Sequence, residues 1–296
     1  MELVVNIAFK DLQVSSRIVC FITLLSVKLV AFRSINPPTL MIIPKKFSSF
    51  CRELYSYIYD NLKGLDFRIW YSYISQEEYE KLIIDLTEDV ELDDFIITPR
   101  LGEYSKIPII IRSLSFAEGT GTHPTTKLIL NNLKILKQYQ SSRVVILDYG
   151  SGSGILSIAC KKLVPNSYVI SIDCEFSYLK EAINNYNYNK VEVGCMLSNN
   201  PKMINFKKLL SNFDKAILII NVPSIVLGMV FKFFANENIF FDLIIMSGIR
   251  KIRGESEELF IKRMDEENFD NYLSNYRWQT NSLQEWILLL AQKKEI

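Results

Sequence analysis

The sequence predicts an α/β protein: a doubly wound sheet of seven strands, the last of which form an antiparallel edge hairpin, with a small N-terminal α+β module. Two observations predict this class. From residue 124 onward, short apolar runs alternate with helical patterns, which is typical of a parallel sheet covered on both faces. The first apolar run also leads into a glycine-rich turn, "LDYGSGSG", that opens a helix.

Composition limits the size of the protein and its partners. The chain has 296 residues, which allows one large domain or two, and 49% of them are hydrophobic, enough for a sizeable core. A net charge of +1 gives no general attraction for polyanions, so we expect no direct nucleic-acid binding. The five cysteines have no CxxC or Cys/His spacing and there is one histidine, so we expect neither disulfides nor a metal site.

Residues 1–45 are basic and poor in acidic side chains, and two interpretations stay open. The apolar run "IVCFITLLSVKLVAF" is shorter than the roughly 20 residues of a membrane-spanning helix, so we expect no stable membrane span. No acidic residue occurs between Asp11 and Glu53, which suits an organelle leader and hence a mitochondrion or plastid. The alternative is an N-terminal extension of ordinary folded structure in a cytoplasmic protein.

Residues 46–112 are predicted to form the small α+β module. The prolines of "NPPT" and Pro44 predict a linker before it. Apolar spacing predicts a helix over 47–62 that stops at Gly64. Further elements are a strand at "FRIWYSY", a helix starting with the capping box "SQEE", and short strands at "DFIITP" and "IPIIIRS".

Residues 113–296 are predicted to form the sheet domain, in which a helix with Pro124 in its first turn precedes the first strand. Helices are predicted at 154–163, 178–187, 224–234 and 255–268. The strands between them are predicted at "RVVILDY", "SYVISID", "KAILIIN", "FFDLIIMSG" and "EWILLLA". Because "YRWQTNSLQEWILLLA" contains no helix, its two strands are expected to pair as the edge hairpin.

The glycine-rich turn indicates a nucleoside ligand. Gly150, Gly152 and Gly154 allow a tight turn and close approach of the backbone, and Asp173 ends the next strand, where a carboxylate can accept hydrogen bonds from ribose hydroxyls. No register of the glycines fits the dinucleotide fingerprint, and no GxxxxGK[ST] phosphate loop is present. Asp148 would repel a pyrophosphate but suits a cationic amino-acid group. S-adenosyl-L-methionine therefore fits best, and the alternative is a tight turn in another α/β protein.

The motifs, taken in order, resemble those of the PrmA-type ribosomal protein lysine methyltransferases, a Rossmann-like class I family that trimethylates a large-subunit ribosomal protein. "EGTGTHPTTKL" resembles the family's FGTGTHPTT signature, and "LDYGSGSGILSIA" resembles its glycine loop. Weaker matches follow at "SIDCE", "INVPS", "MSGI" and "EWILLLA". The resemblance implies a protein methyltransferase domain, and it implies a substrate-recognition role for residues 46–112.

The resemblance also implies site residues. Its glycine–threonine segment lies over the cofactor, which here means Gly119, Thr120, Gly121, Thr122, His123 and Thr126. Thr122 and His123 join the predicted catalytic set, with His123 as a positioning residue rather than a general base. Two alternatives stay open: Thr125 or Thr126 caps or braces the helix, and His123 is a surface residue at a helix end.

Asn221 is predicted to lie at the reacting centre as well as at the cofactor. Methyl transfer from a sulfonium is an in-line displacement, so the acceptor amine must be aligned and neutral. An amide oxygen after the strand "AILII" can orient the hydrogens of an amine without titrating. Ser224 of "NVPS" cannot stack on a planar target, which favours a lysine amine over adenine or a glutamine amide. The alternative is a turn asparagine.

Several departures leave the acceptor open. Glu118 stands where the family usually has Phe, and "GCMLSNNPKM" lacks the adenine-binding signal expected after the third strand. The leading hypothesis is methylation of a ribosomal protein. The alternatives are a lysine methyltransferase acting on another organellar protein, and a catalytically inactive scaffold that binds the cofactor.

Overall fold

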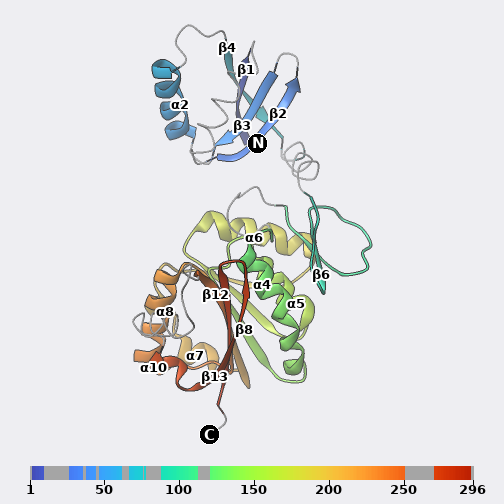
Figure 1. Ribbon diagram of the computed structural model, residues 1–296. Coiled ribbons are helices and arrows are strands. Elements are labelled where there is room, and N and C mark those ends of the chain that lie inside the picture. Colours follow the sequence, from blue (N-terminus) through green and yellow to red (C-terminus); the bar gives the residue numbers. More distant parts are fainter. Residues whose placement is uncertain are drawn as a thin grey trace. The chain divides into compact units, whose positions relative to one another are not determined.

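The computed structural model divides the chain into two compact units (Figure 1). One comprises Met1–Thr87 with Leu114–Phe116, and the other comprises Glu88–Ser113 with Ala117–Ile296. The residues that the structure describes are 2–9, 27–35, 38–44, 47–61, 67–75, 77, 88–112, 121–250 and 270–294.

The first unit contains a four-stranded sheet in the order β2-β3-β1-β4 and one long helix, α2. The outer strand β4 pairs antiparallel with β1 along its whole length, and β1 pairs antiparallel with β3. Phe50 and Leu54, one turn apart on α2, are buried, as are Val5 and Ile7 of β1. The bounds are β1 Glu2–Phe9, β2 Val27–Ile35, β3 Pro38–Pro44, α2 Phe47–Asn61 and β4 Phe67–Ile74.

The helix over 47–62 and the strand at "FRIWYSY" are confirmed, but the boundaries of this unit differ from the predicted ones. Residues 1–45 supply three of the four strands, and their backbone is paired with residues on both sides of "NPPT". Pro38 and Thr39 of that stretch, predicted as a linker, are the first two residues of β3 and pair with Ile35 and Ser34 of β2. Of the helix predicted from "SQEE", only Ser75 and Glu77 lie within the described residues.

The second unit has the predicted seven-stranded sheet, in the order β10-β9-β8-β11-β12-β14-β13. The five strands from β10 to β12 are parallel, and β14 runs antiparallel to both β12 and β13, which confirms the edge hairpin. The bounds are β8 Val144–Tyr149, β9 Tyr168–Asp173, β10 Gly194–Leu197, β11 Lys215–Asn221, β12 Leu243–Arg250, β13 Tyr276–Leu283 and β14 Trp286–Lys293.

Helices cover both faces of this sheet because alternate strand residues point to opposite sides. Val144 and Ile146 join one core cluster with α4, α5 and α6, whereas Val145 and Leu147 join the other with α7, α8 and α10 (Figure 1). The predicted helix at 255–268 lies outside the described residues. The bounds are α4 Pro124–Asn132, η1 Leu133–Tyr139, α5 Ile155–Leu163, α6 Phe176–Asn189, η2 Pro201–Met203, α7 Phe206–Leu210, α8 Ser224–Asn236 and α10 Asp270–Leu273.

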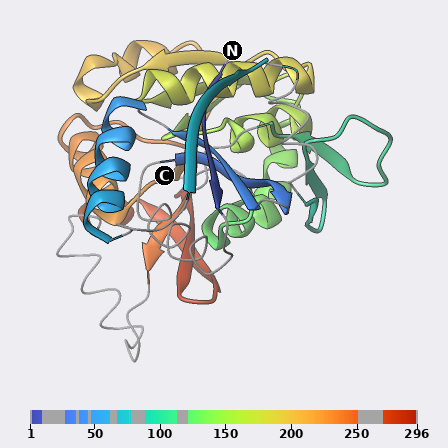
Figure 2. The same cartoon turned by 90° about the horizontal axis from the view of Figure 1, so that it is seen from above.

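Residues 88–112, which we call the arm, form a small three-stranded sheet and belong to the second unit rather than to the predicted module at 46–112. The strands are β5 Val90–Glu91, β6 Phe95–Thr98 and β7 Ile107–Ile110, and the last two confirm the strands predicted there. Phe95 and Ile109 are fully buried in the same cluster as α4 and α5, so apolar packing joins the arm to this unit. In Figure 2 the arm is the blue-green ribbon at the right. Among the described helices, none has the length and apolar character needed to cross a membrane.

Candidate functional site

The glycine loop lies at the carboxyl edge of the parallel sheet, between β8 and α5. The backbone N–H groups of Gly150 and Ser151 donate to the carbonyl of Ile172, at 2.8 and 3.1 Å, so the loop is tied to the end of β9. Gly150 has φ +78°, and a Cβ built there would lie 2.2 Å from Cγ1 of Val222. Only glycine therefore allows the turn after β11 to pack so closely on the loop.

Asp173 holds the other side of this loop. Its carboxylate accepts hydrogen bonds from the backbone N–H of Gly152 at 2.8 Å and of Glu175 at 3.0 Å. The side chain is almost fully buried at the last position of β9. Each carboxylate oxygen has room for a second hydrogen bond, so the group can orient the loop and also accept from a ligand hydroxyl.

Asp148 lies beneath the loop. One carboxylate oxygen accepts from the backbone N–H and the hydroxyl of Ser157, at 3.0 and 2.7 Å, which fastens the first turn of α5 to β8. The other oxygen has no partner within the described residues. Burial raises the pKa of Asp148 to about 6, the bonds from Ser157 lower it, and the charge of Asp173 raises it slightly. The structure shows that Asp148 supports the glycine loop. Its contact with a cationic ligand group stays a prediction.

The glycine–threonine segment leads into α4. Gly119 and Thr120 lie outside the described residues, Gly121 is buried, and Thr122 is exposed. His123 is the N-cap residue of α4, and its Nδ1 accepts from the backbone N–H of Thr125 at 3.3 Å. The side chain that caps this helix is therefore that of His123.

The His123 ring also contacts the last strand. It packs edge-on against the ring of Trp286, with 5.0 Å between the centroids. Glu285, one residue earlier, is exposed and pairs with Arg250 at 3.2 Å. Trp286 thus fixes the orientation of the His123 ring, as a positioning role requires.

Asn221 ends β11 at the same edge and is joined to the glycine–threonine segment. Its Nδ2 donates to the hydroxyl of Thr126 at 3.4 Å, although the two residues are 95 positions apart in the chain. Thr126 is buried and Asn221 is half-buried. Because the amide nitrogen is directed to Thr126, the carbonyl oxygen of Asn221 is left for another donor.

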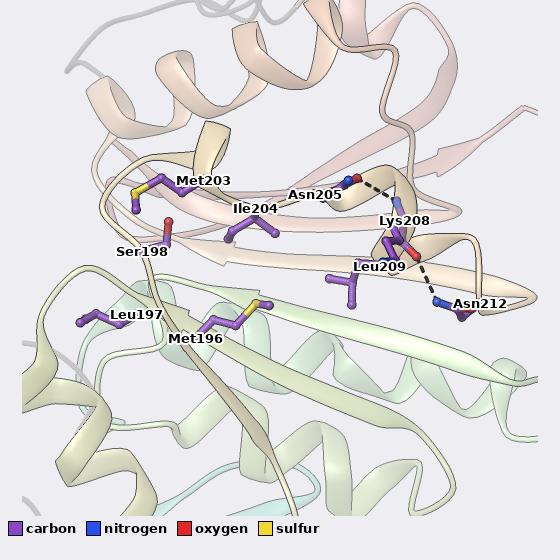
Figure 3. Close-up of a pocket in the computed structure, with 9 residues that line it drawn as sticks. All are labelled: Met196, Leu197, Ser198, Met203, Ile204, Asn205, Lys208, Leu209 and Asn212. Atoms are coloured by element: carbon purple, nitrogen blue, oxygen red, sulfur yellow. Dashed lines mark hydrogen bonds between the residues drawn. The ribbon is translucent and has the colours of Figure 1, made fainter.

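A separate hollow of about 510 Å³ opens at the sheet edge next to β10 (Figure 3). None of the predicted site residues lines it, although Ser198 at its rim donates its backbone N–H to the carbonyl of Asp173 at 2.8 Å. Most of its walls come from "GCMLSNNPKM", the stretch that carries no adenine-binding signal, and from α7. The lining residues are Met196, Leu197, Ser198, Met203, Ile204, Asn205, Lys208, Leu209 and Asn212.

The described part of the site brings together two carboxylates, a glycine loop and an asparagine amide, and neither 147–154 nor 173–176 contains a lysine or arginine. The hydroxyl of Ser151, buried in the loop, has no partner within the described residues. A phosphate would be repelled by the carboxylates, whereas ribose hydroxyls and an ammonium group would be bound. The arrangement suits a nucleoside ligand with a cationic group and no phosphate.

Comparison with known proteins agrees with this site. A family model described as ribosomal protein L11 methyltransferase (PrmA) matches residues 51–294. The chain belongs to the PrmA family. The resemblance of its sequence motifs to this family is thereby confirmed. The match covers the glycine–threonine segment, the glycine loop and the turn after Asn221.

Relatives of the chain include proteins named ribosomal protein L11 methyltransferase. The protein from Aquifex aeolicus is 36% identical over 127 residues, 42% of this chain and 48% of the relative. That from Thermosipho melanesiensis is 35% identical over 133 residues, 45% of this chain and 50% of the relative. The chain thus spans about half the length of these PrmA relatives. A solved structure described as ribosomal protein L11 methylase from Lactobacillus delbrueckii subsp. bulgaricus is 18% identical, with a TM-score of 0.49, 71% of this chain and all of that one covered.

The structure also reveals supporting residues that the sequence patterns did not single out. Val222 packs against Gly150, and its backbone oxygen would lie 2.0 Å from a Cβ at Gly248. Asn185 and Asn189 of α6 are buried, and both bond to the backbone of the arm. A spacing of four residues on a predicted helix could have indicated these two buried asparagines. The same stretch, "INNYNYN", also contains the exposed Asn184 and Asn187, so the sequence does not distinguish them.

Proposed function

We propose that this PrmA-family chain is an S-adenosyl-L-methionine-dependent protein-lysine N-methyltransferase that methylates lysine or amino groups of a large-subunit ribosomal protein, the one named in its relatives being L11. The observation that carries the proposal is the hydrogen bond between Asn221 and Thr126. It links the turn expected at the acceptor amine to the segment expected over the cofactor.

The residues of the site fit this cofactor. Asp173 would hold the ribose hydroxyls, while its bonds to Gly152 and Glu175 keep the carboxylate oriented. The buried hydroxyl of Ser151 and the second oxygen of Asp148 have no partner in the described residues and are available for polar groups of a ligand. When bound, the cofactor supplies a methyl group activated by a sulfonium.

Asn221 would align the incoming amine. Its nitrogen is held by Thr126, so its oxygen can accept a hydrogen bond from the amine and direct the lone pair toward the methyl group. An amide does not titrate, so it cannot take the proton of a lysine. Removal of water from around the amine, near a cationic sulfonium, lowers the pKa of that lysine and provides the neutral form.

Cofactor binding is tested first, by isothermal titration of the full chain with S-adenosyl-L-methionine. We expect micromolar binding, and a loss of about 100-fold in Asp173→Ala because two charge-assisted hydrogen bonds disappear. The matched control is Asp242→Ala, since Asp242 also binds a backbone N–H, that of Ala216 at 2.8 Å, but at the amino end of β11. This control is expected to bind like the wild type.

Transfer is then measured with a methyl-labelled cofactor and large ribosomal subunits that lack the modification. We expect label on one ribosomal protein, at lysine side chains or the terminal amine. A folded wild type that binds no cofactor would refute the proposal as a whole. Binding without label on any ribosomal protein would refute the acceptor and leave the alternatives of another protein substrate or an inactive scaffold.

A further inference from the structure

Two asparagines on one face of α6, Asn185 and Asn189, are buried between this helix and the arm. They are one helical turn apart, so their side chains point in the same direction. Asn185 has no accessible surface and Asn189 has 9%. A primary amide in such a place must satisfy its donors and acceptor within the protein, and both residues do so with backbone groups.

Within the described residues, the amide of Asn189 bonds to the arm and to its own helix. Its oxygen accepts from the backbone N–H of Ile110 at 2.8 Å, and its nitrogen donates to the carbonyls of Ile110 at 2.6 Å and Asn185 at 2.8 Å. Because β7 is an edge strand of the arm, this amide takes the place of a neighbouring strand at Ile110. Its role is to dock the arm on α6.

Asn185 joins the arm to the glycine loop. Its oxygen accepts from the backbone N–H of Arg112 at 3.0 Å, and its nitrogen donates to the carbonyl of Ser153 at 3.0 Å. Ser153 lies between Gly152, which donates to Asp173, and Gly154, the N-cap residue of α5. The Asn185 side chain therefore bridges the glycine loop and the last residue of the arm.

Arg112 is also where the chain leaves the arm toward the glycine–threonine segment. Gly121 of that segment packs on the arm, because Cδ1 of Ile97 in β6 would lie 2.2 Å from any Cβ at this position. The position of the arm therefore affects where Gly121 lies relative to the glycine loop.

We propose that Asn185 is a positioning residue for cofactor binding: it holds the arm, on which Gly121 packs, in a fixed position relative to the glycine loop at Ser153. The amide of Asn189 holds the arm and has no hydrogen bond to the glycine loop among the described residues. This inference rests on the proposed function only for the identity of the ligand. The coupling between arm and loop is a property of the ligand-free chain.

The test compares Asn185→Ala with Asn189→Ala in the full chain, two identical changes one turn apart on the same helix. The first readout is amide hydrogen exchange without ligand. We expect Asn185→Ala to speed exchange in both 107–112 and 150–155, and Asn189→Ala to speed it in 107–112 alone. The second readout is titration with S-adenosyl-L-methionine, where Asn185→Ala should weaken binding about 10-fold, the effect of one or two lost buried hydrogen bonds, and Asn189→Ala by less than about threefold.

The two variants are also compared for melting temperature and for the kinetic constants of transfer. We expect both to melt lower than the wild type, and only Asn185→Ala to raise KM for the cofactor while KM for the acceptor protein is unchanged.

Equal effects on binding, or effects that follow the loss of stability, would overturn the proposal and make both residues purely structural. If Asn185→Ala does not fold, Asn185→Asp keeps the acceptor for Arg112, and the same loop-specific effect is expected from it. A wild type that binds no cofactor would count against the proposed function, whereas unchanged exchange at 150–155 in Asn185→Ala would count against this inference alone.

Discussion

Asn221 is the residue whose role depends most on orientation. Its amide is held by Thr126 at 3.4 Å, and a misplaced amine in an in-line displacement loses rate steeply. We expect Asn221→Ala to lower kcat by about 100-fold while the cofactor Kd changes by less than about threefold. Single-turnover transfer from labelled cofactor and titration of the same preparations check this.

Thr126→Val is the companion variant, because it removes the partner of Asn221 and keeps the shape of the side chain. A smaller loss of kcat, about 10-fold, is expected for it. Wild-type turnover in Asn221→Ala would show that another group aligns the amine.

Asp148 is a single residue that makes the free energy of unfolding depend on pH. Its pKa in the folded protein is raised from 3.8 to about 6, chiefly by burial, so the native state holds this proton more tightly than the unfolded chain does. Stability therefore falls as pH rises from about 4 to about 6, by about 3 kcal/mol from this group, and is level above. Urea unfolding of the wild type and Asp148→Asn across this range measures the difference, which should shrink in the acidic limit; parallel curves would contradict it.

At the scale of elements, the turn after β11 is clamped between two glycines, Gly150 of the cofactor loop and Gly248 of β12. Gly248 has φ +99°, and a Cβ there would lie 2.0 Å from the backbone oxygen of Val222. Backbone cannot yield as a flexible side chain does. The turn that carries Asn221 is therefore positioned by its neighbours on both sides, as a reaction centre needs.

We expect Gly248→Ala to lower the free energy of unfolding by about 2–4 kcal/mol, from the strained φ and the clash together. Gly194→Ala in β10 is the control, since its Cβ would meet nothing closer than 3.6 Å and its φ is ordinary. Denaturant unfolding should place that control within about 0.5 kcal/mol of the wild type. Equal stability of the two variants would mean that the turn after β11 moves freely.

At the scale of the whole molecule, the boundary between the two compact units falls near residue 88, so the arm belongs to the unit with the seven-stranded sheet. The arm shares the core of α4 and α5 through Phe95 and Ile109, and a fragment that starts at 88 keeps these contacts. We expect the fragment 88–296 to fold and to bind S-adenosyl-L-methionine within about threefold of the full chain.

The same fragment is expected to lose most of its methylation of a ribosomal protein, because it lacks residues 46–87 of the region 46–112 for which the family resemblance implies substrate recognition. Transfer to large ribosomal subunits, measured beside transfer by the full chain, decides this. A fragment that begins at 113 is the control, and it should not fold because the arm residues of the core are missing. Full transfer by the 88–296 fragment would place recognition in the sheet unit.

The sequence by itself determined the sheet unit and the elements of its site. Alternation of apolar runs with helices, the glycine loop and Asp173 are local patterns, and local patterns decide the type of each element and the chemistry at the ends of strands. The ordered motifs also determined the PrmA family, which the family model confirms. The sequence is sufficient to predict an element or a site residue when the pattern that indicates it lies within a few neighbouring positions.

Only the tertiary structure decided which distant residues act together. The ring contact of His123 with Trp286, the bond from Asn221 to Thr126 and the bridge from Asn185 to Ser153 join residues that share no local pattern. The same holds for the arm, two of whose three strands were predicted but assigned to the module at 46–112, and for residues 1–45, whose strands pair with residues beyond "NPPT". Packing and hydrogen bonds between remote segments set these partnerships, because burial rewards whichever surfaces meet in space rather than those adjacent in the chain.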